Sequence, residues 1–145
     1  MIPRLKFRAW DKQNEKRLYQ VQALQFYGTN NTVDACWTNG VDFDGEATLG
    51  EPELNNLHDL VLMQCTGNRD INGVQIYEGD IVRNEEYIYA VHFGEFTDTD
   101  DFREPAQRQV GFYIRDVHTD GTFPFYSMRY EVIGNVHENK DLLEG

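Results

Sequence analysis

The sequence has little cysteine, little proline and no long hydrophobic run. Two cysteines in 145 residues do not make a disulfide framework, and a chain of this length can bury a core without one. No segment reads as a signal peptide or as a membrane span. We therefore expect a soluble cytoplasmic protein that is not attached to a membrane.

Basic residues are also scarce. Thirteen Lys and Arg stand against 25 Asp and Glu, which gives a formal net charge of -12. Because nucleic-acid affinity comes largely from neutralising phosphates with cations, this charge disfavours DNA or RNA as a partner. Residues 1–17 nevertheless hold six cations and two acids, so the basic charge is concentrated at one end of the chain.

Motifs of catalysis are missing as well. The sequence contains no GxSxG, no phosphate-binding glycine loop and no HExxH. The four histidines are far apart, without the paired spacing of a zinc site. Cys36 or Cys65 would need an adjacent histidine to act as a nucleophile, and a lone cysteine between apolar residues is more often a small buried side chain. We expect no catalytic residue, no cofactor and no metal.

What the sequence does contain is a series of strand-like runs separated by turns. Alternating, β-branched and aromatic residues predict strands at 4–10, 18–27, 33–37, 62–64, 76–77, 81–83, 87–93, 110–117 and 130–136. The first two are expected to form a hairpin. After Pro52, the spacing of Leu54 and Leu57 predicts one short helix. Residues 41–50 and 95–108 are predicted loops.

The richest series of turn signals lies between residues 62 and 83. Its glycines are expected to adopt the positive φ that tight turns require, and an aspartate after one of them is expected to accept backbone hydrogen bonds. A further glycine in the last strand predicts a bulge or a close approach of the backbone. These structural turn positions are Gly67, Gly73, Gly79, Asp80 and Gly134.

These elements predict a mostly β (α+β) fold. The C-terminal half, 62–145, is expected to form a small SH3-like barrel, because curling a sheet of short strands satisfies most of its edges. Residues 1–61 would add the N-terminal hairpin and the short helix. We expect the two parts to form one compact unit.

Three stretches resemble the YopX family of phage and prophage proteins. They are IPRLKFRAWD at 2–11, LMQCTGNRDINGVQIYEGDIVR at 62–83 and YEVIGNVHENKDLL at 130–143. The resemblance implies a phage or prophage origin, and hence a bacterial host cytoplasm, a mostly β fold with an SH3-like C-terminal barrel, and homo-oligomers. It implies no established biochemical activity and supplies no catalytic residues.

Two acidic segments are candidate cation sites. Residues 68–73 match the first half of an EF-hand loop, but the twelfth position, where a bidentate acid belongs, is Gly79. A structural turn is the better interpretation. The loop at 95–108 carries acids that could bind a hard cation, although such clusters are usually solvated. They are Asp98, Asp100, Asp101 and Glu104.

The first predicted strand also indicates an interface. Strict alternation places Leu5, Phe7 and Ala9 on one face, and we define the residues of the other face as the basic stripe. The basic stripe consists of Arg4, Lys6, Arg8 and Trp10. A two-fold contact would set it against its own copy, whereas a head-to-tail contact could place it against the acidic loop of the next subunit. We expect an oligomer larger than a dimer.

The sequence therefore favours a non-catalytic phage accessory protein that acts by binding protein, from the phage or its host, and by self-assembly. The alternative is a nucleic-acid-associated SH3-like barrel, in which exposed aromatic side chains stack on bases. Most aromatic residues of the C-terminal half are expected to be core, and acids outnumber the arginines there.

Overall fold

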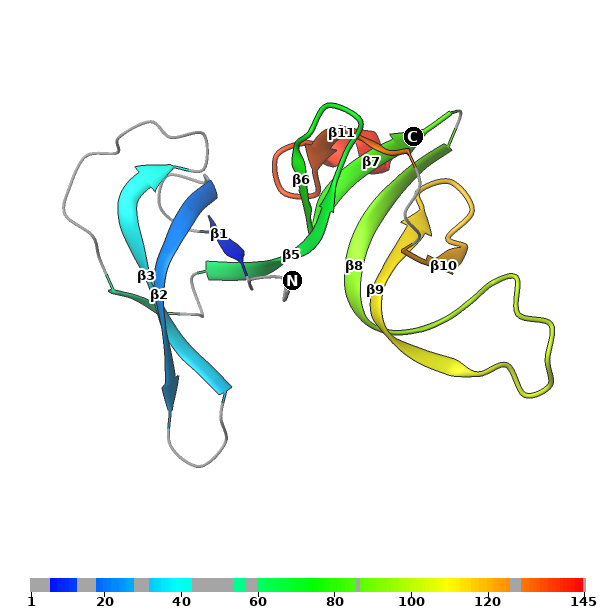
Figure 1. Ribbon diagram of the computed structural model, residues 1–145, viewed down its shortest axis with the longest axis horizontal. Helices are drawn as coiled ribbons and strands as arrows, with labels where there is room; N and C mark the ends of the chain where they lie inside the picture. The colour runs from blue at the N-terminus through cyan, green and yellow to red at the C-terminus, as the bar shows by residue number, and fades with distance from the viewer. Residues whose placement is uncertain are drawn as a thin grey trace. The chain divides into compact units, whose positions relative to one another are not determined.

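A computed structural model describes residues 6–12, 18–27, 32–42, 54–56, 60–85, 87–125 and 129–144. The fold is mostly β, as the sequence predicted, with antiparallel strands in two sheets and very little helix. The chain divides into two compact units (Figure 1). We call Leu5–Gln64 the N-terminal unit, and the part that begins at Cys65 the C-terminal unit.

The N-terminal unit is a sheet with the order β4-β3-β2-β1-β5. Its strands are β1 (Phe7–Asp11), β2 (Leu18–Tyr27), β3 (Thr32–Asp42), β4 (Leu54–Asn56) and the first half of β5 (Leu60–Arg69). β1 and β2 pair antiparallel, which confirms the predicted N-terminal hairpin. Beyond Gln64, β5 continues into the C-terminal unit and pairs with β6 (Gln75–Tyr77).

The predicted helix after Pro52 is wrong. Leu54–Asn56 is strand β4, and its residues pair with Ala35, Cys36 and Trp37 of β3. Two consecutive asparagines are weak helix formers, and the eleven-residue strand β3 offers them backbone partners. Backbone pairing with β3 therefore outweighs the helical spacing of Leu54 and Leu57.

The C-terminal unit contains a five-stranded antiparallel sheet with the order β10-β9-β8-β7-β11. The strands are β7 (Asp80–Asn84), β8 (Tyr87–Thr97), β9 (Arg108–Asp116), β10 (Thr122–Pro124) and β11 (Glu131–Asn135), followed by the 3-10 helix η2 (Lys140–Leu143). Their shared core consists of Ile76, Val82, Val91, Ile114 and Tyr130. All five side chains are almost fully buried.

The closed SH3-like barrel is not shown. In the part of the chain that the structure describes, the end strands β10 and β11 do not pair with each other. A neighbouring loop bonds to β10, and another bonds to Tyr130, which directly precedes β11. The Ile71 N–H donates to the carbonyl of Tyr130 at 2.9 Å, and the Thr99 N–H donates to that of Thr122 at 2.7 Å. Covering edges in this way removes much of the advantage of closure.

The longest hairpin of the C-terminal unit is formed by β8 and β9. Its register is continuous from Tyr89↔Asp116 to Thr97↔Arg108. Gly94 and Gly111 are directly opposite each other, with φ of 150° and 154°. Both strands curve in Figure 1, and a pair of glycines permits such a bend because neither carries a Cβ. We call the part of this hairpin from the pair His92↔Tyr113 outward, which includes the glycine pair, the distal hairpin.

Candidate functional site

The turn between β5 and β6 holds the C-terminal unit together through Asp70. This carboxylate is 8% exposed. It accepts hydrogen bonds from the backbone N–H groups of Asn72 at 2.8 Å, Val74 at 2.9 Å and Val132 at 3.0 Å. Because Val132 belongs to β11, one side chain closes the turn and ties it to an end strand. The role of Asp70 is therefore structural.

Among the other predicted turn positions, Gly67 lies within strand β5, where the pairing with β6 shifts register, and not in a turn. The remaining ones lie in turns, at the start of a strand or in close contacts. Gly67, Gly73 and Gly79 have φ of 85°, 82° and 87°. The buried Asp80 accepts a hydrogen bond from the Tyr77 N–H at 2.8 Å. At Gly134 the pairing of β11 with β7 shifts register, and an added Cβ would lie 2.5 Å from Oδ1 of Asn139. These positions therefore shape the fold.

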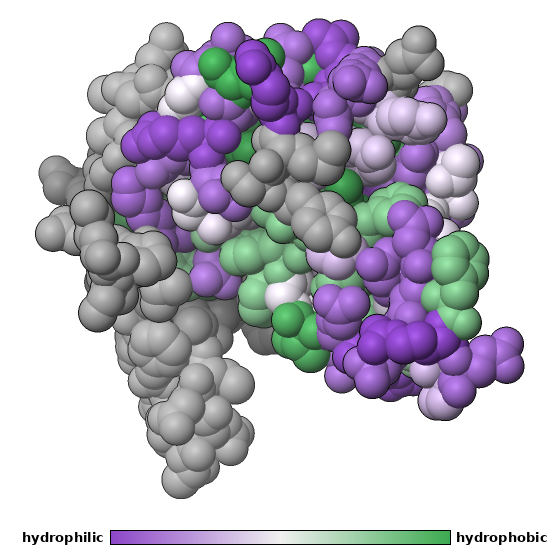
Figure 2. All heavy atoms as spheres, turned by 45° about the vertical axis from the view of Figure 1, so that its right-hand side comes forward, coloured by the Kyte–Doolittle hydropathy of each residue, from purple (hydrophilic) through white to green (hydrophobic). Residues whose placement is uncertain are grey.

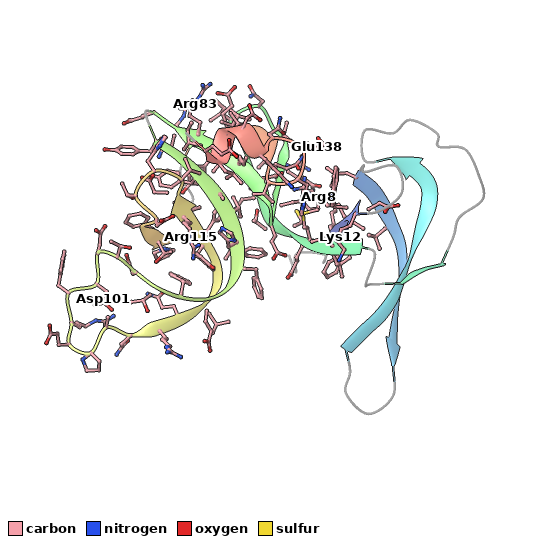
Figure 3. All side chains as sticks on the ribbon, turned by 180° about the vertical axis from the view of Figure 1, so that it is seen from behind. Arg8, Lys12, Arg83, Asp101, Arg115 and Glu138 are labelled. Carbon is pink, nitrogen blue, oxygen red and sulfur yellow. The ribbon has the colours of Figure 1, made fainter. Side chains whose placement is uncertain are left out.

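The basic stripe is not a continuous exposed surface. Arg8 is 3% exposed, so its place on an outward face is a correction to the sequence prediction. The reason is that Arg8 lies directly opposite Met63 of β5, and its guanidinium Nη2 donates to Sδ of the buried Met63 at 3.8 Å (Figure 3). Lys6 is exposed and Trp10 is partly exposed, while Arg4 lies outside the described residues.

The acidic loop between β8 and β9 is shorter than predicted, because β8 extends to Thr97 and β9 begins at Arg108. Asp101 organises it (Figure 3). Both carboxylate oxygens bond to the Arg103 guanidinium, at 2.7 and 2.9 Å, and Oδ2 also accepts the Gln107 N–H at 3.1 Å. The hydrogen bond from the Arg103 guanidinium, together with those from the backbone N–H groups of Gln107 and Arg103, holds the pKa of Asp101 well below its usual range.

Neither acidic segment gathers the ligands of a cation site. Among the residues that the structure describes, no three His, Cys, Asp or Glu side chains come together as metal ligands. The oxygens of Asp70 are directed at backbone N–H groups, and those of Asp101 at Arg103.

No helix in the described ranges has the length and apolar character needed to cross a membrane.

Val110, the most exposed hydrophobic residue in the described strands, lies on the distal hairpin. Directly opposite residues of antiparallel strands place their side chains on the same face. The pair Val91 and Ile114 faces the core. The next pair on that face is Phe93 and Phe112, whose ring centroids lie 4.9 Å apart, and Val110 follows. The core-facing side of the hairpin thus continues beyond the core.

This continuation is open to solvent. Phe93 is 47% exposed and Val110 is 72% exposed. We call Phe93, Val110 and Phe112 the distal hairpin surface. Phe102, in the adjoining loop, is 88% exposed. On the face drawn in Figure 2, hydrophobic side chains form a group at the surface among hydrophilic ones. Exposed apolar groups of this kind commonly mark a binding surface.

The opposite face of the same hairpin carries a stack of three rings. Tyr113 stacks on His92 at 5.2 Å and on Phe96 at 4.8 Å. Burial, with a smaller contribution from the charge of Arg115, lowers the pKa of His92 below its ordinary 6.5. The imidazole is therefore neutral at pH 7. Because Phe96 is only 8% exposed and the rings cover one another, little ring surface is open to a base.

A third candidate is a shallow hollow of about 600 Å³. It is lined by Ile71, Arg83, Asn84, Glu85, Arg129 and Glu131. Arg83 and Glu131 are cross-strand neighbours, and Nη2 of Arg83 lies 2.6 Å from Oε2 of Glu131 (Figure 3). The two arginines and two glutamates of the lining balance each other. The hollow therefore has no net charge with which to select an anion or a cation.

Comparison with known proteins places the chain in a family. The model of the family described as "YopX protein" matches residues 6–144. The chain belongs to the YopX family. No curated protein matches it. Among solved structures, it is similar to the protein EF1440 from Enterococcus faecalis, with 27% sequence identity and a TM-score of 0.49, over 98% of this chain and 99% of that one.

The distal hairpin surface is not apparent from the sequence. Strand aromatics such as Phe93 and Phe112 are expected in the core, and no sequence feature assigns a role to the loop residue Phe102. The signal that could have found them is the glycine pair, because Gly94 and Gly111 show where a long hairpin bends away from its core. That pairing requires a register, which the sequence alone did not provide.

Proposed function

We propose that this YopX protein is a non-catalytic accessory protein of a phage or prophage, which binds protein partners and its own copies in the bacterial cytoplasm. The phage setting rests on the resemblance drawn from the sequence. The observation that carries protein binding is the distal hairpin surface, where Phe93 and Val110 are exposed next to a buried core. Burying them against a partner would remove apolar area from water, which favours association.

Self-assembly is tested by light scattering at tens of micromolar. We expect the wild type to form an oligomer larger than a dimer, and Phe93→Ser with Val110→Ser to lower its mass because apolar contact is lost. Val74→Ser is the matched control: Val74 is 48% exposed against 47% for Phe93, but it lies in the β5–β6 turn. Circular dichroism checks that each variant is folded.

The basic stripe is tested in the same measurement with Lys6→Glu, which changes an exposed charge. Arg8→Glu is unsuitable, since it would place a carboxylate in a buried position. A lower mass for Lys6→Glu would favour the predicted head-to-tail contact. A wild-type monomer at these concentrations would contradict self-assembly altogether.

The alternative is a nucleic-acid-associated SH3-like barrel, for which the stack of His92, Tyr113 and Phe96 beside Arg115 is the relevant feature. We expect labelled single- and double-stranded DNA and RNA to bind weakly or not at all, because the net charge of -12 opposes phosphates. Titration across salt concentrations checks this. Tight binding at low salt that weakens steeply with added salt would support the alternative instead.

A further inference from the structure

The distal hairpin has backbone groups that point away from it. β8 pairs with β7 only as far as Ala90, and the last bond on that side runs from the Gly79 N–H to the carbonyl of Val91 at 2.8 Å. In an antiparallel strand, alternate residues direct their N–H and C=O to the same side. Phe93 and Glu95 therefore direct theirs to the side that Val91 uses, and no described residue pairs with them there.

The side chains along this edge are amphipathic. Phe93 presents an apolar ring beside Phe112, and Glu95 follows on the same face with 68% of its side chain exposed. A strand that paired with the edge would place every second side chain against these rings. The surface therefore suits an extended segment in which apolar residues alternate with polar ones, better than it suits a helix.

The loop that follows this edge carries more acids than cations. Asp100 and Glu104 are exposed, and neither forms an ion pair with any residue in the described ranges. Asp101 is neutralised by Arg103, and Arg108 lies 3.8 Å from Glu95 in a highly exposed and weak pair. An acidic neighbourhood attracts Lys or Arg in a partner and repels acids.

We propose that the β8 edge at Phe93 and Glu95 binds an extended segment of a partner protein by strand addition, and that this segment alternates apolar residues with Lys or Arg. The backbone bonds would supply affinity and the alternating side chains specificity. The inference rests on the proposed protein-binding function and names the chemistry of the partner. Adding a strand would also cover an open edge that otherwise invites non-specific pairing.

The test uses the full chain and a fluorescent peptide, Lys-Val-Thr-Val-Lys-Val-Thr-Val-Lys, followed by anisotropy. Three further probes are compared. The first carries N-methyl groups on alternate amides, which remove edge hydrogen bonds and keep the side chains. The second has Glu in place of Lys, and the third is a single-stranded oligothymidine.

We expect the parent peptide to bind, and both N-methylation and Glu replacement to weaken it at least about tenfold. Phe93→Ser should weaken binding several-fold, whereas the equally exposed control Val74→Ser should bind as the wild type does. Equal binding of the N-methylated peptide, no binding of the parent peptide, or preference for the oligothymidine would each overturn strand addition.

The two proposals can fail separately. If no peptide binds but the mass in light scattering still falls with Phe93→Ser and Val110→Ser, strand addition is wrong and protein binding through this surface stands. If no peptide binds, the wild type is a monomer and the two substitutions leave its mass unchanged, both proposals are wrong.

Discussion

Replacing Asp70 with alanine is expected to lower the free energy of unfolding by about 3 kcal/mol, a large part of the stability of a typical domain. The carboxylate is buried and accepts three backbone hydrogen bonds, two within the β5–β6 turn and one from Val132 of β11. Its removal leaves three N–H groups without their acceptor and releases the turn from the sheet. Urea unfolding followed by circular dichroism measures the loss.

Two variants separate this effect from a general loss of charge. Asp70→Asn keeps the shape and one acceptor oxygen, so we expect roughly half of the loss. Asp98→Ala removes a carboxylate that, among the residues the structure describes, accepts one hydrogen bond, from the Asp100 N–H in an exposed loop, and should change stability by less than about 0.5 kcal/mol. Equal stability of Asp70→Ala and the wild type would contradict a structural role.

The same carboxylate predicts a dependence on pH. Burial by itself would raise the pKa of Asp70, but the hydrogen bonds from Val132, Val74 and Asn72 outweigh it and the pKa is lowered from 3.8. A group with a lowered folded-state pKa stabilises the protein fully above its unfolded-state pKa and loses that contribution as pH falls through the folded-state value. The stability difference between wild type and Asp70→Asn should therefore shrink below about pH 4.

Gly79→Val is expected to destabilise the fold by about 2 kcal/mol. Gly79 has a φ of 87°, which a β-branched residue adopts only with strain. The backbone cannot relax easily, because the Gly79 N–H donates to Val91 and its carbonyl accepts from the Val136 N–H, both at 2.8 Å. Thermal unfolding monitored by circular dichroism measures the change.

Gly79→Asn is the matched variant for this position. Asparagine tolerates the left-handed region better than valine does, so it should recover a substantial part of the lost stability. An identical melting temperature for Gly79→Val and the wild type would show that the turn adapts. Equal losses for Asn and Val would show that the added volume, rather than φ, is responsible.

Much of the fold could be predicted because local sequence carries it. The strand at 18–27 has the same bounds in the structure, and the strands at 81–83, 87–93 and 110–117 fall within or beside β7, β8 and β9. Alternation and β-branched residues act over a few positions, so a short window reveals them. The positive φ of Gly73 and Gly79 is equally local, since a tight turn needs a residue without a Cβ.

Other features depended on neighbours that are distant in sequence. Leu54–Asn56 became a strand because β3 was beside it, and Arg8 became buried because it packs against Met63 of β5. The distal hairpin surface also depends on contacts between residues that are distant in sequence. Whether Phe93 and Val110 are core or surface depends on where the rest of the core ends, which the pairing of β8 with β9 determines.

The β class, the family, most strand positions and most turns could thus be predicted from the residues, because they depend on backbone conformation and on spacing along a few residues. The open sheet, the burial of Arg8 and the exposed apolar face of the distal hairpin became clear from the three-dimensional structure alone. Burial depends on contacts between residues far apart in the chain, and alternation within one strand cannot tell which of its faces another element will cover.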